Sequence, residues 1–445
     1  MIIDLYELPE LLKNQTIISN EIIEVRGRLE LSRNKNKLCF LVLRDHGITL
    51  QIVLHKSSIS EKEFKLACDC HLESLVQLTG KLVDAKVKSC SIQKYEIQCQ
   101  TFEVINQAKV SGIPINKNFI YTNPDTAHEF RVLDMRNNTN QWILMVKSKI
   151  VGYCQDYFKK HQFIQIQTPK LISTASEGGA EVFKLKYFNK DAFLAQSPQL
   201  YKQMAINCEL PRVFEIGSVF RAENSNSKRH LTEFTGIDME MRIKKHYHEV
   251  VHHLWNLVVF VIDNLVLNDN QLLTQLNSDF DIQYPTQPLI LKYKDGVELL
   301  KKDGITVETT GITGAQEKRL GELVKQKYNS DLFVLDEFPS SLRPFYTKSC
   351  HETPEISRSY DIILRGMEIL SGAQRVDNYS ELISNLGKQG VDETKIKHYL
   401  ESFQYGSYPH GGGGFGLERL TMNLLGLDNI RQTCLFYRDP KRLAP

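Results

Sequence analysis

Between residues 22 and 104 the sequence consists of short runs in which apolar and polar residues alternate. A period of two predicts strands with one buried face, and the Gly residues between or inside the runs indicate turns. Residues 60–68 (SEKEFKLAC) instead fit a short helix between the third and fourth runs. The pattern therefore predicts a small, closed, antiparallel barrel of five strands, the arrangement of an OB-fold. The runs are EIIEVRGRLEL, KLCFLVLRD, ITLQIVL, SLVQLTGKLVD and KYEIQCQTFEVI.

The pattern changes after Val110. The segment SGIPINKNFIYTNPDT breaks any periodicity with Gly, Pro and Asn, which indicates a linker. Beyond it, helices are predicted over residues 140–160 and 248–267, and a strand after the first helix ends at Pro169. Strands and helices mix without a regular βαβ alternation, which favours an antiparallel α+β sheet over a Rossmann fold. Further strand-like segments are DAFLAQS, RVFEIGSVFRAE and LTEFTGIDMEMRI.

The chain is therefore predicted to have two domains. The barrel occupies residues 1–106, a hinge or linker residues 107–127, and the α+β domain residues 128–445. Residues from about 269 to 339 are more polar and less patterned than their surroundings, so an insertion within the second domain is predicted there.

The charges of the chain are nearly balanced. Lys and Arg number 55 and Asp and Glu 53, a formal net charge of +2 in 445 residues, which excludes a disordered polyelectrolyte. A polyanionic partner must therefore be held by local basic patches. The nine cysteines form no C-x-x-C pair, as is typical of reduced intracellular proteins. The N-terminus resembles no targeting peptide, and no stretch approaches the roughly 20 apolar residues of a spanning helix, so we expect a cytoplasmic protein without a membrane partner.

Two short motifs suggest chemistry that their surroundings do not support. Residues 248–252 read H-E-x-x-H, the spacing of a zinc protease helix, but no obvious third ligand follows and the segment is simply rich in His. Gly411, Gly413 and Gly416 match the dinucleotide fingerprint G-x-G-x-x-G, but the residues before them indicate a loop rather than a buried parallel strand. An amphipathic helix and a Gly-rich strand are the simpler interpretations.

Charged and glycine residues are concentrated in otherwise apolar segments of the second domain. Arg221 follows an apolar strand and faces, across the basic loop NSNSKRH, a strand that carries Phe234. An Arg so placed can bridge a phosphate, and the aromatic ring can stack on a base. Arg419 follows the run GGGGFGLE at the start of a helix and can reach a terminal phosphate. Asp361 and Glu368 offer hard oxygen ligands for a phosphate-bound Mg²⁺.

These segments resemble motifs 1, 2 and 3 of the class II aminoacyl-tRNA synthetases. The motifs are the region around Pro169, the hairpin FRAE…RHLTEF and the strand and helix GGGGFGLER. Further strings are similar to the aspartyl subfamily (class IIb) of archaea and the eukaryotic cytosol, and the similarity covers nearly the whole chain. These strings are FRVLDMR, TPKLI, SEGGAEVF, LAQSPQLYKQ, FRAENSNSKRHLTEFTGIDMEM, RPFYT and EILSGAQR.

The resemblance implies a two-step reaction that uses ATP and Mg²⁺. Aspartate attacks the α-phosphorus of ATP to give aspartyl-adenylate and pyrophosphate, and the terminal ribose of tRNA(Asp) then takes the aspartyl group. Arg221, Arg419 and Glu368 would be the catalytic residues, and Asp361, Glu368 and Ser371 would hold the Mg²⁺. The residues expected to bind ATP are Arg221, Glu223, Arg229, His230, Leu231, Phe234, Glu368, Ile369, Ser371, Gly416 and Arg419.

For the amino acid, the resemblance implies a site with two cations. Lys202 and Arg375 would bind the side-chain carboxylate, and Asp238 would hold both cations, which leaves the pocket at +1. The related asparaginyl enzymes lack a lysine at the position of Lys202. The residues expected to bind aspartate are Ser176, Glu177, Gln199, Lys202, Arg221, Asp238, Ser371 and Arg375, with the first three on the α-ammonium group.

The same resemblance assigns the barrel to the tRNA anticodon. Phe40 would stack on a base, and Gln51 and Glu96 would bind base edges; a plain core role for Phe40 is the alternative. Residues 26–37 (RGRLELSRNKNK) carry five cations and one Glu, a local patch of net +4.

Motif 1 would form a homodimer interface. Three other interpretations stay open: an asparaginyl-tRNA synthetase, a paralogue that uses the adenylating site without tRNA, and a noncatalytic RNA-binding regulator.

Overall fold

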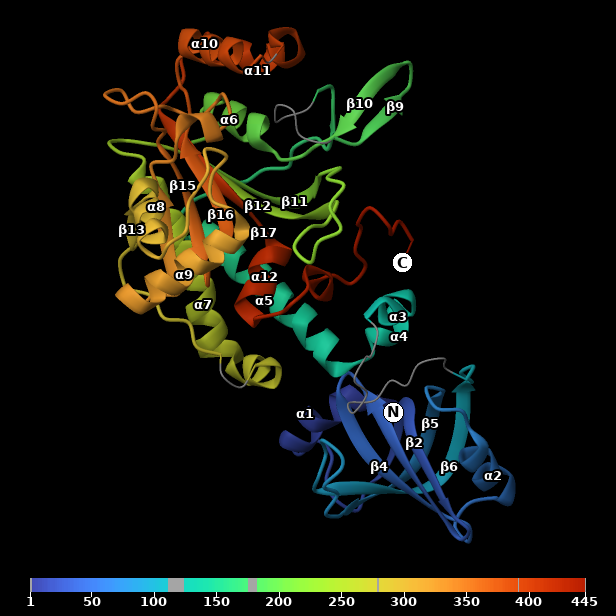
Figure 1. The fold of residues 1–445 in the computed structure, drawn as a ribbon. Coiled ribbons are helices and arrows are strands. Elements are labelled where there is room, and N and C mark those ends of the chain that lie inside the picture. The colour runs from blue at the N-terminus through green and yellow to red at the C-terminus, as the bar shows by residue number, and fades with distance from the viewer. Residues whose placement is uncertain (1, 111–123, 175–181, 278–279, 391, 445) are drawn as a thin grey trace. The chain divides into compact units, whose positions relative to one another are not determined.

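The computed structural model describes the whole chain except residues 1, 111–123, 175–181, 278–279, 391 and 445 (Figure 1). The chain separates into two compact units, Met1–Gln141 and Trp142–Pro445. The linker predicted over 107–127 includes residues 111–123, so most of it lies outside the described residues.

The N-terminal unit is a five-stranded barrel, as the alternating runs predict (Figure 1). The barrel closes because β2 pairs with both β3 and β5, and α2 lies between β4 and β5 in the chain. A short strand, β1, adds to β2 in parallel, which the sequence pattern did not indicate. The elements of this unit are β1 (Ile2–Asp4), η1 (Leu5–Glu7), α1 (Leu8–Lys13), β2 (Ile22–Lys35), β3 (Leu38–Asp45), β4 (Ile48–His55), α2 (Glu61–Asp69), β5 (Leu75–Asp84), β6 (Tyr95–Asn106), α3 (Pro124–Glu129) and α4 (Arg131–Asp134).

The second unit is built on an eight-stranded sheet in the order β13-β14-β15-β16-β17-β12-β11-β7 (Figure 1). Every pair from β14 to β11 is antiparallel, which confirms the predicted α+β sheet; only the outermost strands, β13 and β7, pair in parallel. The strands are β7 (Ile164–Gln165), β8 (Leu171–Ile172), β9 (Lys184–Tyr187), β10 (Lys190–Leu194), β11 (Arg212–Phe220), β12 (Glu233–Arg242), β13 (Ile290–Lys292), β14 (Leu332–Asp336), β15 (Ser359–Leu364), β16 (Met367–Gln374) and β17 (His410–Gly416). The helices are α5 (Asn138–Lys160), α6 (Gln199–Asn207), α7 (His248–Leu276), α8 (Tyr293–Lys302), α9 (Gly314–Tyr328), η2 (Ser340–Leu342), α10 (Tyr379–Gln389), η3 (Glu393–Ile396), α11 (Lys397–Glu401), α12 (Leu417–Leu425) and η4 (Ile430–Thr433).

The two faces of this sheet differ in chemistry because side chains alternate along each strand. On one face, Met239, Ile362 and Phe415 pack with α5, α7 and α12 in the main core. Their strand neighbours Asp238 and Asp361 point the other way. Asp238 and Asp361 thus lie on the face opposite the core helices, whereas Asp336 on β14 faces Tyr247 and His248 at the start of α7.

Two predicted segments differ from what the structure shows. The strand predicted up to Pro169 is shorter than expected: β7 covers only Ile164–Gln165 and pairs with β11, and β8, which pairs with β10, begins after Pro169. Residues 269–339, for which the sequence predicts an insertion, supply α8, α9 and the sheet strands β13 and β14. Every residue of β14 is buried, so this strand shows no alternation that a pattern could reveal.

Helix α7 is longer than predicted, because it continues to Leu276 across a kink at Asp269. By length and composition it could cross a membrane. Its apolar residues, however, pack into the main core against the sheet, as those of a core helix do.

The H-E-x-x-H segment at the start of α7 has structural partners. Glu249 accepts hydrogen bonds from the backbone N–H groups of Lys245 and His246, which precede the helix, and so fixes the turn that leads into it. His248 Nε2 lies 2.8 Å from a carboxylate oxygen of the buried Asp336. These contacts favour the interpretation as an ordinary helix start.

His253, further along α7, gives the second unit a pH-dependent stability. Its ring contacts Tyr157, His161 and Phe163, and burial, aided by the charge of Arg212, lowers the pKa of His253 to about 4. Below its ordinary pKa of 6.5 the unfolded chain therefore binds a proton at this His that the native state excludes. We expect the free energy of unfolding to fall by about 1–3 kcal/mol as the pH falls through this window.

Urea unfolding at several pH values measures this effect. Replacing His253 by Asn should flatten the dependence, whereas the same change at the exposed His398 should not. Equal pH slopes for the wild type and His253→Asn would contradict the assignment.

Candidate active site

A cavity of about 340 Å³ lies on the face of the sheet that carries Asp238, opposite the core helices. This volume is typical of small-molecule sites. Its walls come from β11, β12, β16, β17, α6, α12 and the loop between β11 and β12, so segments far apart in the sequence meet here. The predicted site residues that line it are Gln199, Lys202, Arg221, Glu223, Arg229, His230, Leu231, Phe234, Asp238, Glu368, Ile369, Ser371, Arg375, Gly416 and Arg419.

The other predicted residues fall into three groups. Asp361 is buried on strand β15, where it lies directly opposite Ser371 of β16. Ser176 and Glu177 lie outside the described residues. The three barrel residues belong to the N-terminal unit.

One end of the cavity combines an aromatic ring with cations. The guanidinium of Arg221 lies 5.6 Å from the centre of the Phe234 ring, and its buried Nε has no hydrogen-bond partner within the described residues. Gly416 lies beside the same ring; a Cβ there would stand 3.5 Å from it. Glu223 stands 3.9 Å from Arg221, on the loop side. This end has the groups that a flat base and a phosphate require.

Carboxylates gather at the centre of the site. Burial and the neighbouring charge of Asp361 raise the pKa of Glu368, although Arg419 is 3.9 Å away and opposes the shift. Arg343 donates to Asp361 Oδ2 at 2.8 Å and to Ser371 Oγ at 3.0 Å. The other oxygen of Asp361, Oδ1, is buried without a hydrogen-bond partner among the described residues.

Two members of this group, Arg343 and Glu317, are not predicted by the sequence. Arg343 lies in the quoted string RPFYT, so its charge was visible but its position beside the acids was not. Glu317 lies on α9, in the segment with the weakest pattern, and accepts a hydrogen bond from the backbone N–H of Glu368. Burial and the charge of Glu368 raise the pKa of Glu317 to about 7. No local signal could have linked Glu317 to this site.

The opposite end of the cavity holds two buried ion pairs. Lys202 Nζ lies 2.9 Å from Asp238 Oδ1, and Arg375 Nε lies 3.0 Å from Glu240 Oε1. The sequence predicts that Asp238 holds both cations; in the structure Asp238 pairs with Lys202, whereas the fully buried Glu240 pairs with Arg375 and also lies 3.6 Å from Lys202. The four charges together are neutral rather than +1. Glu240 does not line the cavity, so the wall itself presents two cations and one anion.

The Gly-rich strand β17 makes room for these acids. A Cβ on Gly414 would lie 2.4 Å from Asp238 Oδ1, and one on Gly412 would lie 2.3 Å from Glu240 Oε2. The register places each glycine directly opposite the acid on β12. These glycines therefore accommodate the acids that orient Lys202 and Arg375.

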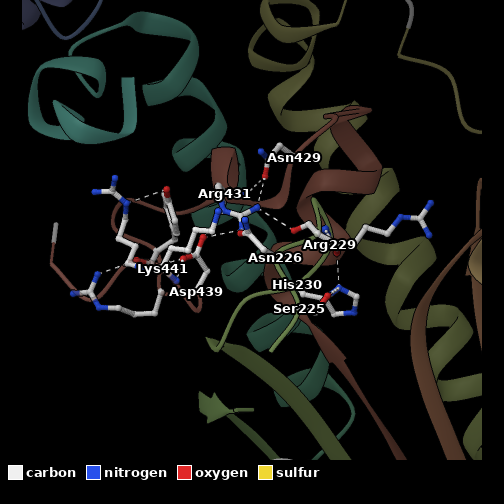
Figure 2. Close-up of polar contacts among 12 residues, drawn as sticks. Ser225, Asn226, Arg229, His230, Asn429, Arg431, Asp439 and Lys441 are labelled. Atoms are coloured by element: carbon white, nitrogen blue, oxygen red, sulfur yellow. Dashed lines mark hydrogen bonds and ion pairs between the residues drawn. The ribbon is translucent and has the colours of Figure 1, made fainter. Parts of the chain in front are cut away.

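The loop of residues 221–232 carries Arg229 and His230 to the cavity (Figure 2). The Nδ1 of His230 is hydrogen-bonded with the hydroxyl groups of Ser225 and Ser227. Burial is the main reason that the pKa of His230 is lowered. At neutral pH this ring therefore acts as a hydrogen-bonding group rather than as a cation.

The barrel residues share one outer face. Phe40 alternates with the buried Cys39 and Leu41 on β3, and its partly exposed ring therefore points away from the barrel core. Gln51 Nε2 donates to Glu96 Oε2 at 2.8 Å across the parallel pair β4 and β6. The strand register places Phe40 and Gln51 on the same side of the sheet.

The chain matches the family described as tRNA synthetases class II (D, K and N) over residues 123–440, and an OB-fold nucleic acid binding domain over residues 23–105. It is 40% identical to the human cytoplasmic aspartate–tRNA ligase, over 96% of this chain and 89% of that protein. The aspartyl-tRNA synthetase from Entamoeba histolytica has a TM-score of 0.87 at 36% identity, covering 96% and 90% of the two chains. An asparaginyl-tRNA synthetase from Pyrococcus horikoshii, complexed with asparaginyl-adenylate, has a TM-score of 0.88 at 29% identity, covering 96% and 97%. This chain therefore belongs to the class II tRNA synthetases of the D, K and N type.

Proposed function

We propose that this protein is a cytoplasmic aspartate–tRNA ligase, which activates L-aspartate with ATP and transfers it to tRNA(Asp). The observation that carries the proposal is the pair of buried cations, Lys202 and Arg375, in the cavity wall. A lysine has three N–H donors and an arginine five. The hydrogen bonds from Lys202 to Asp238 and from Arg375 to Glu240 use only some of these donors. The remaining donors suit a short side-chain carboxylate. A neutral amide would satisfy them less well, since its NH₂ group is itself a donor.

The geometry supports a distinct role for each end of the cavity. Adenine would stack on Phe234, with Arg221 on the α-phosphate, where negative charge grows as the aspartate carboxylate attacks. Arg419 and Arg229 would hold the outer phosphates. Catalysis of this kind depends mainly on positioning and on fixed positive charge.

The acidic centre fits a Mg²⁺ ion bound to the ATP phosphates. Mg²⁺ usually takes one or two carboxylates and completes its shell with phosphate oxygens and water. Asp361 and Glu368 would hold it with Ser371. The oxygen of Asp361 that has no partner among the described residues and the raised pKa of Glu368 both indicate a place for a cation. When bound, the ion would offset phosphate charge. Within the described ranges no three His, Cys, Asp or Glu side chains are grouped to hold a metal by themselves, which agrees with a site that the nucleotide completes.

Pyrophosphate exchange tests the proposal directly. We expect ATP–pyrophosphate exchange that depends on aspartate, and charging of tRNA(Asp) in the same preparation. Exchange with asparagine in place of aspartate would identify an asparaginyl enzyme instead. Exchange without any tRNA charging would favour a tRNA-independent paralogue, and the absence of both reactions a noncatalytic regulator.

Anticodon binding by the barrel leads to a separate prediction. Stacking of a base on an aromatic ring is worth about 1–3 kcal/mol, so Phe40→Ala should raise the KM for tRNA about tenfold. Pyrophosphate exchange, which needs no anticodon, should stay unchanged. The control is Ile22→Ala, a truncation on β2 at a side chain that is 62% exposed. An unchanged KM for tRNA in Phe40→Ala would leave Phe40 with a packing role alone.

We further infer a homodimer formed through α5 and β7. The support is that β7 is an edge strand and that Ile164 on it and Met145 on α5 are exposed apolar residues, at 44% and 38%. Analytical ultracentrifugation should show a dimer that Ile164→Lys converts to a monomer. Leu267→Lys, on the exposed side of α7, is the control and should stay dimeric. A stable wild-type monomer would contradict this interface.

A further inference from the structure

Arg431, on η4, joins three segments of the second unit (Figure 2). Its Nε donates to Asp439 Oδ2 at 2.9 Å, and its Nη2 donates to Asn226 Oδ1 at 2.9 Å. Its Nη1 donates to the carbonyl oxygen of Ser227 at 3.0 Å and to Asn429 Oδ1 at 3.3 Å. The side chains of Arg431 and Asp439 are only 7% and 6% exposed. A planar guanidinium with all three nitrogens engaged fixes the relative positions of its acceptors.

The loop of residues 221–232 depends on these contacts for its shape. It has no helix or strand of its own. Backbone hydrogen bonds attach it from outside: Ile430 N donates to Lys228 O, and Thr232 N donates to Arg438 O, each at 2.9 Å. The middle of the loop is thus held by η4 and its end by the C-terminal segment.

We propose that Arg431 is a positioning residue that keeps this loop in the conformation in which Arg229 and His230 face the cavity. The C-terminal segment takes part through Asp439, which neutralises the buried guanidinium and orients it toward Asn226 and Ser227. The assignment of ATP phosphates to this end of the cavity rests on the proposed function; the anchoring of the loop does not. Arg431 itself does not line the cavity, so it acts only through the loop.

The proposal predicts a selective defect in Arg431→Lys. A lysine keeps the charge next to Asp439 but cannot reach three segments at once, so the loop gains freedom. We expect the KM for ATP to rise on the order of tenfold, with the KM for aspartate within about twofold of the wild type. A merely structural role would instead lower stability and affect both substrates. The control is Arg365→Lys, because Arg365 also joins separate segments through backbone carbonyls, those of Leu424 and Asp281, but lies away from the loop.

Limited trypsin digestion of the native full-length protein gives a readout that needs no activity. Lys228 and Arg229 are cleavage sites within the loop, and we expect faster cleavage there in Arg431→Lys but not in Arg365→Lys. Asn226→Ala removes one of the two contacts that Arg431 makes with the loop and keeps the one to the carbonyl oxygen of Ser227. It should show the same change to a smaller degree, and it provides the test if Arg431→Lys does not fold. Unchanged loop cleavage in both variants, or equal changes in the KM values for ATP and aspartate, would overturn the proposal. A protein without aspartate-dependent exchange but with faster loop cleavage would retain the anchoring role and lose the proposed function.

Discussion

Replacing Lys202 by methionine should lower the rate of aspartate-dependent pyrophosphate exchange by a factor on the order of 10²–10³. Lys202 is 2% exposed and lies in the cavity wall. In the variant the carboxylate of the substrate would therefore enter a site that lacks this cation and has little water to replace it. Methionine has a similar length, and the change therefore removes charge with little loss of volume. The loss should appear in kcat/KM for aspartate and much less in the KM for ATP.

The matched control for this variant is Lys170→Met. Lys170 also forms an ion pair with a carboxylate of the same sheet, Glu215 on β11, at 2.6 Å, but it does not line the cavity. A general loss of folding would affect both variants, and thermal unfolding separates this outcome from a local defect. Aspartate activation that remains at the wild-type level in Lys202→Met would remove Lys202 from the amino-acid site and reopen the asparaginyl alternative.

Replacing Arg221 by glutamine should slow the formation of aspartyl-adenylate on the order of 10³-fold. The guanidinium stands next to the Phe234 ring with a buried N–H that has no partner in the described part of the chain, so it is already oriented toward a ligand. Glutamine can still donate a hydrogen bond, but it carries no charge to balance the charge that develops at phosphorus. Rapid-quench measurement of a single turnover with aspartate and ATP isolates this step.

Arg242→Gln is the matched control for the second variant. Arg242 is also stacked on an aromatic ring, Tyr408, at 3.6 Å, and has buried N–H groups, yet it lies outside the cavity. Comparable slowing of adenylate formation in both variants would mean that the loss of any Arg with a buried N–H group disturbs this unit, and the assigned role of Arg221 would fail.

The sequence predicts best those elements that have one face in the core and one in solvent. The barrel strands alternate over most of their length, so their number and the helix between the third and fourth of them could be predicted. Strand β14 is buried on both faces and β7 pairs over two residues, and neither leaves a periodic signal. Residues 269–339 thus appeared unpatterned although they complete the sheet.

The candidate site shows the same division. Some site residues lie in sequence motifs that can be recognised along the chain, and the structure brings them to one cavity. These residues are Arg221, Phe234, Glu368 and Arg419. Glu240 escaped notice because its importance depends on which strand lies beside β12 and in which register. Pairs of this kind are set by tertiary structure and cannot be inferred from spacing along the chain.

The register of β17 against β12 has a consequence for how this protein can change over time. The nearest atoms to a methyl group added at Gly414 all belong to Asp238, the residue that orients Lys202. A change from glycine to alanine is ordinarily mild in a strand. Here it would displace Asp238, the acid that orients Lys202, while the main core stays intact. We therefore expect a substitution at Gly414 to impair the discrimination between amino acids before it unfolds the protein. Selection at this position would then act on the accuracy of translation rather than on stability.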